Sequence, residues 1–238
     1  MHSKEASANS SLIVEFVGLP GVGKSTLSRR TAAALTNDYP RVAEPISRID
    51  ERPALFRVLS KARFCVEHAI RRPRTAIDGI LSVQATEQPT TGDSVRVGFN
   101  FQYTASVVTH ARSNSGMTLL DQGPYQALWS IGLRSSIHWH DLFDHFDHLL
   151  SRIAPDLVVL IEADTDTIAD RLRSRTDGDT RFAPSTPEFD RGVDGYNRLK
   201  QWVQSSNRPE SIVIENETLS DLDTGVHQIV DAVYALSS

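Results

Sequence analysis

The sequence predicts an α/β fold in which a parallel sheet of about five strands lies between two layers of helices. Three observations support this prediction. Short apolar runs alternate with helical patterns, the first run leads into a glycine-rich loop, and no long linker divides the 238 residues. Right-handed crossovers between parallel strands place helices on both faces of a sheet. We therefore expect one domain over residues 12–238, preceded by a disordered polar tail over residues 1–11.

Five short runs have the composition of buried strands. They are rich in aliphatic and β-branched residues, and most are followed by turn residues. The first run ends at a glycine and is expected at the centre of the sheet. In chain order the runs are Leu12–Val17, Arg41–Glu44, Met117–Asp121, Asp156–Ile161 and Ser211–Glu215.

Helical patterns fill the intervals between these runs. Prolines punctuate a mostly helical stretch between residues 53 and 89, since proline fits the first turn of a helix but not its interior. Six apolar residues between Leu142 and Ile153 fall on one helical face, which we expect to pack on the sheet. The other expected helices are residues 24–36, Thr165–Arg175, Glu188–Gln204 and Leu219–Leu236.

Residues 18–25 match the phosphate-binding pattern G-x-x-x-x-G-K-[ST] between a predicted strand and a predicted helix. Glycines let such a loop turn its backbone N–H groups inward, where they and the helix N-terminus bind phosphate. A chance match is expected about once in five hundred sequences of this composition. The expected nucleotide-binding residues are Gly18, Leu19, Pro20, Gly21, Val22, Gly23, Lys24, Ser25 and Thr26.

A magnesium site is expected beside this loop. Lys24 should reach the β- and γ-phosphates, and the Ser25 hydroxyl should bind Mg²⁺. Asp121 follows the apolar run Met117–Leu120 and is the candidate second metal ligand. Its alternative role is to cap the turn that begins at Gln122. No glutamate follows Asp121, which argues against a motor-type ATPase.

In these and several further stretches, the chain resembles the P-loop nucleoside and nucleotide kinases, and within them the thymidylate kinases and deoxynucleoside kinases. The resemblance covers most of residues 12–236. Besides the phosphate loop, the matching stretches are Val42-Ala43-Glu44-Pro45, Phe99-Asn100-Phe101-Gln102, Pro155-Asp156, Glu162-Ala163-Asp164, Ala169–Arg175, Asp179–Phe182, Phe189 and Gly195-Tyr196.

This resemblance implies a three-layer P-loop NTPase fold with an arginine-containing lid at about residues 174–187. It implies ATP and Mg²⁺ as cofactors, with Arg171, Arg175 and Arg181 closing over the triphosphate. The alternative for Arg171 and Arg175 is the solvated face of a helix. Phe101 and Gln102 would bind a base, although a glutamine in a helix is more often a surface or satisfied polar residue.

Two departures from the thymidylate kinase pattern bear on the acceptor. That family has Asp-Arg after the third strand and an arginine before Glu-Pro, whereas this chain has Asp121-Gln122 and Ala43-Glu44. Because a phosphorylated acceptor needs cations and a hydroxyl needs a base, Glu44 as general base favours an uncharged acceptor. Arg48 and Arg52 could restore the missing charge.

The identity of the phosphoryl acceptor therefore stays open. It is a nucleoside, a nucleoside monophosphate, or the hydroxyl of an antibiotic, sugar or other metabolite. A non-kinase ATPase or nucleotide switch is the remaining alternative. A GTPase would need an N-K-x-D or T-K-x-D motif, and none of the four lysines lies in one. A histidine and aspartate cluster over residues 138–148 is expected to be a solvated helix face and not a metal site.

Composition predicts a cytoplasmic protein. The formal net charge is −5, there is one cysteine, and no apolar segment is long enough to span a membrane. We therefore expect a small-molecule acceptor, with no nucleic-acid or membrane partner. The sequence leaves the oligomeric state open, and a homodimer is one possibility.

Overall fold

The computed structural model describes residues 11–36, 39, 41–44, 54–174, 182–184, 186–205 and 209–237. Its centre is a five-stranded parallel sheet with the order β2-β3-β1-β4-β5. The predicted parallel sheet and its central first strand are confirmed. The strands are β1 (Ser11–Val17), β2 (Val42–Ala43), β3 (Gly116–Leu120), β4 (Leu157–Glu162) and β5 (Glu210–Glu215).

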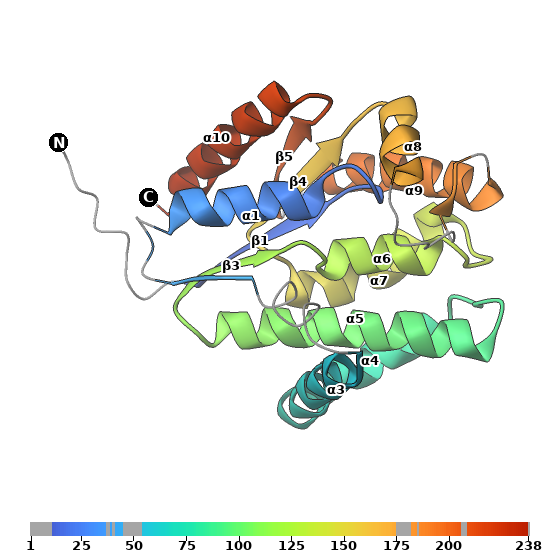
Figure 1. Ribbon diagram of the computed structural model, residues 1–238. Helices are drawn as coiled ribbons and strands as arrows, with labels where there is room; N and C mark the ends of the chain where they lie inside the picture. The colour runs from blue at the N-terminus through green and yellow to red at the C-terminus, as the bar shows by residue number, and fades with distance from the viewer. Residues whose placement is uncertain are drawn as a thin grey trace.

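Helices cover both faces of this sheet, as Figure 1 shows. On one face lie α1 (Lys24–Leu35) and α10 (Leu219–Leu236). On the other face lie α5 (Thr91–Arg112) and α6 (Pro124–Gly132). The three-layer arrangement follows from the parallel strands, because each crossover must return over a sheet face.

The remaining helices form an outer layer. Both α3 (Ala54–Arg71) and α4 (Pro73–Gln84) pack against α5. The helix α7 (Trp139–Ile153) contacts α6 and α9 (Pro187–Ser205), and α8 (Thr165–Arg173) follows β4. No helix of the described residues is both long and apolar enough to cross a membrane.

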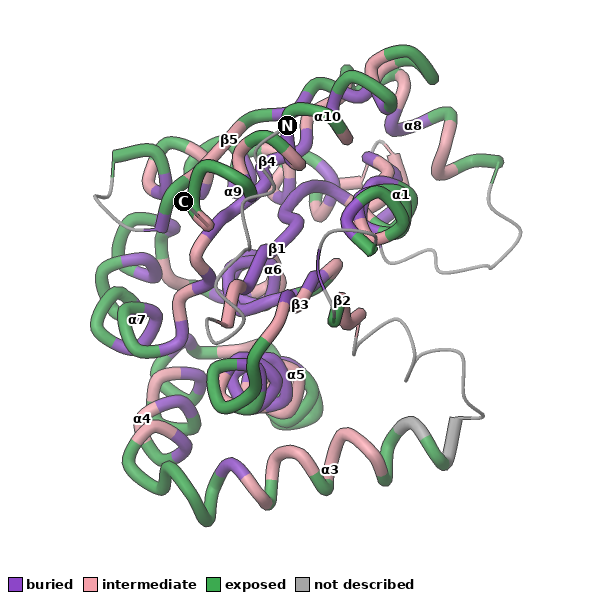
Figure 2. Tube along the Cα trace, turned by 90° about the vertical axis from the view of Figure 1, so that its left-hand side faces the viewer, coloured by how far each residue is buried: buried purple, intermediate pink, exposed green. Residues whose placement is uncertain are grey.

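The hydrophobic core is centred on β1 and β4. Ile13, Val14, Phe16 and Val17 of β1 are fully buried, as is every residue of β4 from Leu157 to Ile161. Figure 2 shows this buried centre in purple, enclosed by helices whose outer faces are exposed. A central strand covered on both faces has no solvent side, which explains the continuous apolar runs.

Three sequence expectations need correction. The apolar face of α7 is buried, but it packs mainly on helices, because α5 and α6 already occupy that face of the sheet. The helix α6 was not expected at all. Ser11, assigned to the tail, is the first residue of β1. Residues 1–10 lie outside the described residues, as does most of the expected lid.

Candidate active site

The glycine-rich loop connects β1 to α1 and has the geometry that the motif requires. Gly21 and Gly23 adopt φ angles of 91° and 102°, in the left-handed region that favours glycine. A Cβ atom on Gly23 would lie 2.3 Å from the Asn216 side-chain nitrogen. Any larger residue would therefore clash, and the loop leads directly into the N-terminus of α1, where an anion is favoured.

Asn216 follows β5, at one edge of the sheet, and its side chain holds the loop in place. Its side-chain amide donates to the Val22 carbonyl at 2.6 Å, and its backbone N–H donates to the Glu162 carbonyl at 2.9 Å. Asn216 is buried, so these bonds are shielded from water. The loop conformation is therefore set by packing as well as by its own glycines.

Lys24 is the first residue of α1, and its side chain returns across the loop. Its ammonium donates to the carbonyls of Gly18 at 2.7 Å and Leu19 at 3.0 Å. The positive charge is thus held against the inner side of the loop. Phosphate oxygens are the natural partners of an ammonium group in that position.

Ser25 and Asp121 meet at the same edge of the sheet. The Ser25 hydroxyl donates to the Asp121 carboxylate at 3.3 Å, and Asp121 directly follows β3. Carboxylate and hydroxyl oxygens are ligands that Mg²⁺ accepts, and this ion often completes its shell with phosphates and water. The pair therefore fits a nucleotide-bound Mg²⁺. No cluster of three metal-binding side chains occurs among the described residues.

A cleft of about 390 Å³ opens beside the loop. This volume is within the range of small-molecule sites. Its far wall is formed by α5 and α6, and apart from Lys24 every described side chain lining it is uncharged. The lining residues are Pro20, Gly21, Gly23, Lys24, Ser25, Thr26, Asn100, Gln122, Gln126, Trp129 and Ser130.

A buried carboxylate that the sequence analysis missed supports the α6 wall. Glu15 of β1 has no exposed surface and accepts the backbone N–H of Gln126 at 2.8 Å. The Gln126 side chain in turn accepts the backbone N–H of Gly18 at 3.0 Å. Gly123 leaves room for this contact, because a Cβ there would lie 2.4 Å from the Glu15 carboxyl carbon. The chain Glu15–Gln126–Gly18 thus ties α6 to the phosphate loop.

Burial raises the pKa of Glu15 to about 8, against the lowering effect of backbone hydrogen bonds at Gln126, Tyr125 and Gly123. Burial also raises the pKa of the Tyr125 hydroxyl, with the Glu15 charge as the next cause. A signal for Glu15 was present in the sequence: it is an acid in the middle of the run that we placed at the sheet centre.

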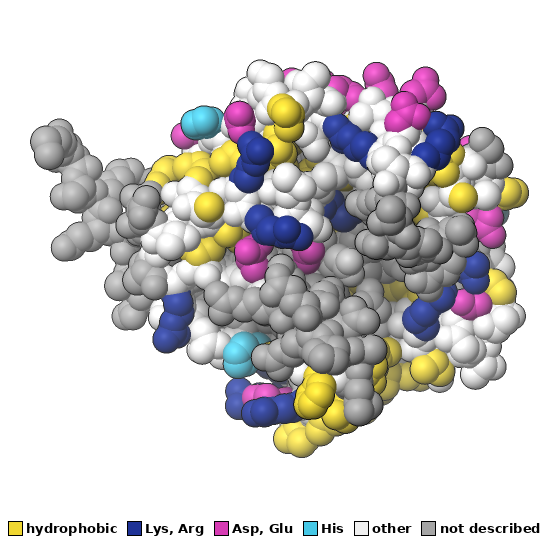
Figure 3. All heavy atoms as spheres, in the orientation of Figure 1, with side chains coloured by type: hydrophobic (Ala, Val, Ile, Leu, Met, Phe, Trp, Pro, Cys, Tyr) yellow, Lys and Arg dark blue, Asp and Glu magenta, His cyan; other side chains and the backbone are white. Residues whose placement is uncertain are grey.

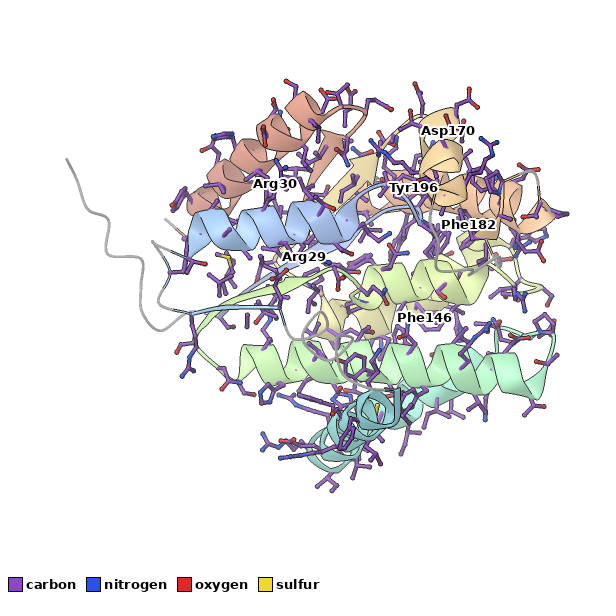
Figure 4. The ribbon with its side chains drawn as sticks, viewed as in Figure 1. Arg29, Arg30, Phe146, Asp170, Phe182 and Tyr196 are labelled. Carbon is purple, nitrogen blue, oxygen red and sulfur yellow. The ribbon has the colours of Figure 1, made fainter. Side chains whose placement is uncertain are left out.

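Trp129 links the cleft to α9. Its indole N–H donates to the Gly192 carbonyl at 2.9 Å, and its ring lies edge-on to Phe182 at 5.6 Å. Figure 4 labels Phe182, which lies close to α9, and Tyr196 on α9 itself. The Tyr196 hydroxyl donates to the Ile161 carbonyl at 2.8 Å, so α9 is fixed to the end of β4.

Glu44, Phe101 and Gln102 are not among the described residues that line this cleft. Glu44 follows β2 and accepts a hydrogen bond from Ser28 of α1 at 2.9 Å. Phe101 is buried against Phe146 of α7, with ring centroids 5.2 Å apart. Gln102 donates to the Ala76 carbonyl of α4 at 2.8 Å, so α5 presents Asn100 to the cleft and Gln102 to α4.

Of the three expected lid arginines, the structure describes one. Arg171 on α8 donates through Nη2 to the Glu217 carbonyl at 2.9 Å, while its buried Nη1 has no acceptor among the described residues. Arg175 and Arg181 lie outside the described residues, as do Arg48 and Arg52.

The histidine and aspartate cluster of α7 lies on the solvent side, as expected. His140 and Asp144 are both well exposed, and their nearest nitrogen and oxygen atoms are 3.3 Å apart. The opposite, apolar face of α7 is buried.

Comparison with solved structures identifies the fold. The deoxyadenosine kinase from M. mycoides with bound dCTP matches with a TM-score of 0.53 and 14% identity, over 94% of this chain and 100% of that chain. The same enzyme with the products dCMP and dCDP gives 0.56 and 12%, over the same shares of the two chains. Thymidylate kinase from Ehrlichia chaffeensis gives 0.52 and 13%, over 94% and 99%.

No protein-family model matches the sequence, and no curated protein matches it. The likeness is therefore one of structure, at low sequence identity. It confirms that this chain has the fold of the P-loop nucleoside and nucleotide kinases.

Proposed function

We propose that the protein is an ATP-dependent kinase that transfers the γ-phosphoryl group to a small-molecule acceptor, a nucleoside or nucleoside monophosphate in the first instance. The observation that supports this most is the phosphate loop itself: Lys24 bridges its carbonyls, and Ser25 contacts Asp121 at the edge of a cleft of small-molecule size. The structural neighbours are kinases whose structures contain nucleotides such as dCTP and dATP.

Each side chain has a role in this proposal. Backbone N–H groups of residues 18–26 bind the phosphates, and Lys24 offsets negative charge on the transferred group. Ser25 and Asp121 hold Mg²⁺. When bound, Mg·ATP supplies the phosphoryl group. Arg171 has one guanidinium nitrogen left to donate to the triphosphate, with Arg175 and Arg181 as its proposed partners.

The cleft favours an uncharged acceptor. Gln122 stands where the thymidylate kinase pattern has arginine, and it lines the cleft with Asn100 and Ser130. Amides and hydroxyls of this kind orient a neutral polar ligand by hydrogen bonds but do not neutralise a phosphate. We propose Glu44 as the general base that accepts the proton of the acceptor hydroxyl. We propose that Phe101 and Gln102 support the part of α5 that binds a nucleobase.

A transfer assay tests the acceptor. Purified protein with γ-labelled ATP and Mg²⁺ is incubated with matched nucleosides, their monophosphates, aminoglycosides and sugars. Label should appear in a nucleoside in preference to its monophosphate. Transfer to a sugar or antibiotic alone would replace the nucleoside by that alternative, and only background hydrolysis with every acceptor would refute the kinase proposal.

The metal site gives a separate prediction. Asp121→Asn preserves the shape of the side chain and removes its charge, so half-saturation by Mg²⁺ should need a concentration about 10- to 100-fold higher. Binding of a fluorescent ATP analogue, titrated with Mg²⁺, measures this without turnover. The exposed Asp231→Asn on α10 is the matched control. An unchanged Mg²⁺ dependence in the Asp121 variant would remove that residue from the metal site.

The location of the reaction is also part of the proposal. ATP is abundant in the cytoplasm, and the single cysteine, Cys65, forms no internal disulfide. We therefore propose that the protein acts in the cytoplasm.

A further inference from the structure

Glu15 is an unusual residue for its position in the fold. Figure 3 shows aspartate and glutamate side chains on the surface of the molecule, where water solvates their charge. Glu15 instead lies in the middle of β1, and among the described residues it is the one acidic residue that is buried. Burial of a carboxyl group is costly, whereas an aliphatic residue would suit this strand. Sequences break such local rules mainly at functional sites, so the contacts of Glu15 indicate its role.

Glu15 caps a helix that has no side-chain cap of its own. The N-cap residue of α6 is Gly123, which has no side chain to accept a hydrogen bond, and Pro124 follows it. The backbone N–H groups of the first turn therefore need an acceptor from elsewhere in the chain. Glu15, 111 residues away at the centre of the sheet, accepts the N–H of Gln126 at 2.8 Å. The position of the first turn of α6 is thus set by β1.

The strand β1 is a rigid support for this cap. Glu15 lies between Leu120 of β3 and Val158 of β4 in the parallel sheet, so strands on both sides hold its backbone. Its carboxyl group also fits closely against α6, because a Cβ on Gly123 would lie 2.4 Å from the carboxyl carbon. Central strands are among the most stable parts of a fold. A helix end bound to such a strand has little freedom to shift.

Gln126 connects this cap to the phosphate loop. Glu15 binds its backbone, and its side-chain Oε1 accepts the N–H of Gly18 at 3.0 Å. Gly18 directly follows β1 and is the first residue of the loop. The hydrogen bond between Gln126 and Gly18 is buried, which shields it from competition with water. Because Gln126 also lines the cleft, one side chain of the α6 wall binds the loop directly.

The two sides joined by this link serve the two substrates of the proposed reaction. In that reaction the phosphate loop binds ATP, and α6 contributes Gln126, Trp129 and Ser130 to the wall that faces the acceptor. We propose that Glu15 and Gln126 are positioning residues, which hold α6 and the phosphate loop in the alignment that phosphoryl transfer requires. This inference rests on the proposed kinase function. An error of about 1 Å in such an alignment can cost about 100-fold in rate.

Steady-state kinetics of two apolar variants test this role. Glu15→Met removes the acceptor of the cap, and Gln126→Leu removes the contact with Gly18. With deoxyadenosine, thymidine and thymidylate as acceptor probes, each variant should lower kcat about 10- to 100-fold and leave KM values within about 3-fold of the wild type. The reason is that alignment acts on the transition state and not on the binding of either substrate alone. Ser106→Ala, which removes a buried hydroxyl of α5, is the matched control and should keep wild-type kinetics.

Two further variants separate positioning from the general cost of a core substitution. Glu15→Gln keeps an oxygen that accepts the Gln126 N–H, so its kcat should stay within about 3-fold of the wild type. The double variant Glu15→Met with Gln126→Leu should be no slower than the slower single variant, because both residues act through one link. Independent effects would instead multiply.

Hydrogen exchange tests the link in the absence of any nucleotide. The Gly18 amide donates to Gln126, so its exchange rate reports on that hydrogen bond. In the protein without ligand, this amide should exchange at least about 10-fold faster in Glu15→Met and in Gln126→Leu than in the wild type. The amide of Ile229, a buried residue of α10, should exchange as in the wild type, which shows that the fold is intact.

Three outcomes would overturn the proposal: a wild-type kcat in both apolar variants, a Glu15→Gln variant as slow as Glu15→Met, or unchanged exchange of the Gly18 amide. Failure of the kinase function looks different, because the wild type would then transfer no phosphoryl group to any acceptor while the exchange experiment still decides whether the link exists. If Glu15→Met does not fold, Gln126→Leu provides the same test, because it leaves β1 unchanged.

Discussion

Replacement of Lys24 by alanine is expected to lower the rate of phosphoryl transfer by at least about 10²- to 10³-fold. The ammonium is held against the inner side of the loop by the carbonyls of Gly18 and Leu19, at 2.7 and 3.0 Å. In the proposed reaction, a charge in that place stabilises the charge that develops on the transferred phosphoryl group. Steady-state transfer assays at saturating ATP and Mg²⁺ measure the loss.

Two further variants separate the charge from the loop contacts. Lys24→Met preserves most of the side-chain length without the charge, and it should be as slow as the alanine variant. Lys24→Arg preserves the charge, but its planar, larger group does not reproduce a compact ammonium, so it should also be impaired. Lys61→Ala is the control, because Lys61 lies on α3 over the Tyr103 ring. Near-normal turnover of Lys24→Ala would contradict the assignment of this loop.

The sequence predicts the sheet and the loop well because both depend on local patterns. The runs at β1 and β4 are continuous and apolar because both faces of a central parallel strand are covered. The loop is predictable because Gly21 and Gly23 must adopt positive φ angles and the motif fixes their spacing. Such constraints act within a few residues, so a single sequence reveals them.

The walls of the cleft depend on contacts between distant segments, and the sequence predicts them poorly. Gln126 reaches Gly18 over a separation of 108 residues, and Asn216 reaches Val22 over 194. Phe101 and Gln102 were selected by their motif, yet the rotation of α5 presents Asn100 to the cleft instead. That rotation is set by packing against α4 and α7, which no pattern in the α5 sequence encodes.

We expect the buried Glu15 to make the free energy of unfolding decrease as pH rises. Its pKa is raised from 4.5 to about 8 in the folded protein, mainly by burial. Between these values the folded state binds a proton that the unfolded state has released. The contribution is therefore fully present below about pH 4.5 and is lost as pH rises through about 8, at about 1.4 kcal/mol per pH unit within that window.

Urea unfolding of the wild type and of Glu15→Gln at pH 5, 6, 7 and 8 measures this effect. Glutamine preserves an oxygen that can accept the Gln126 N–H and cannot ionise, so the free energy of unfolding of the variant should depend less on pH. The difference in unfolding free energy between the wild type and the variant is the quantity to compare. Burial lowers the pKa of His68, and this histidine therefore destabilises both proteins alike as pH falls. Glu210→Gln, an exposed change on β5, should follow the wild type. Parallel curves for the wild type and Glu15→Gln would show that Glu15 ionises without cost, and that the link from Glu15 through Gln126 to Gly18 does not depend on a neutral carboxyl.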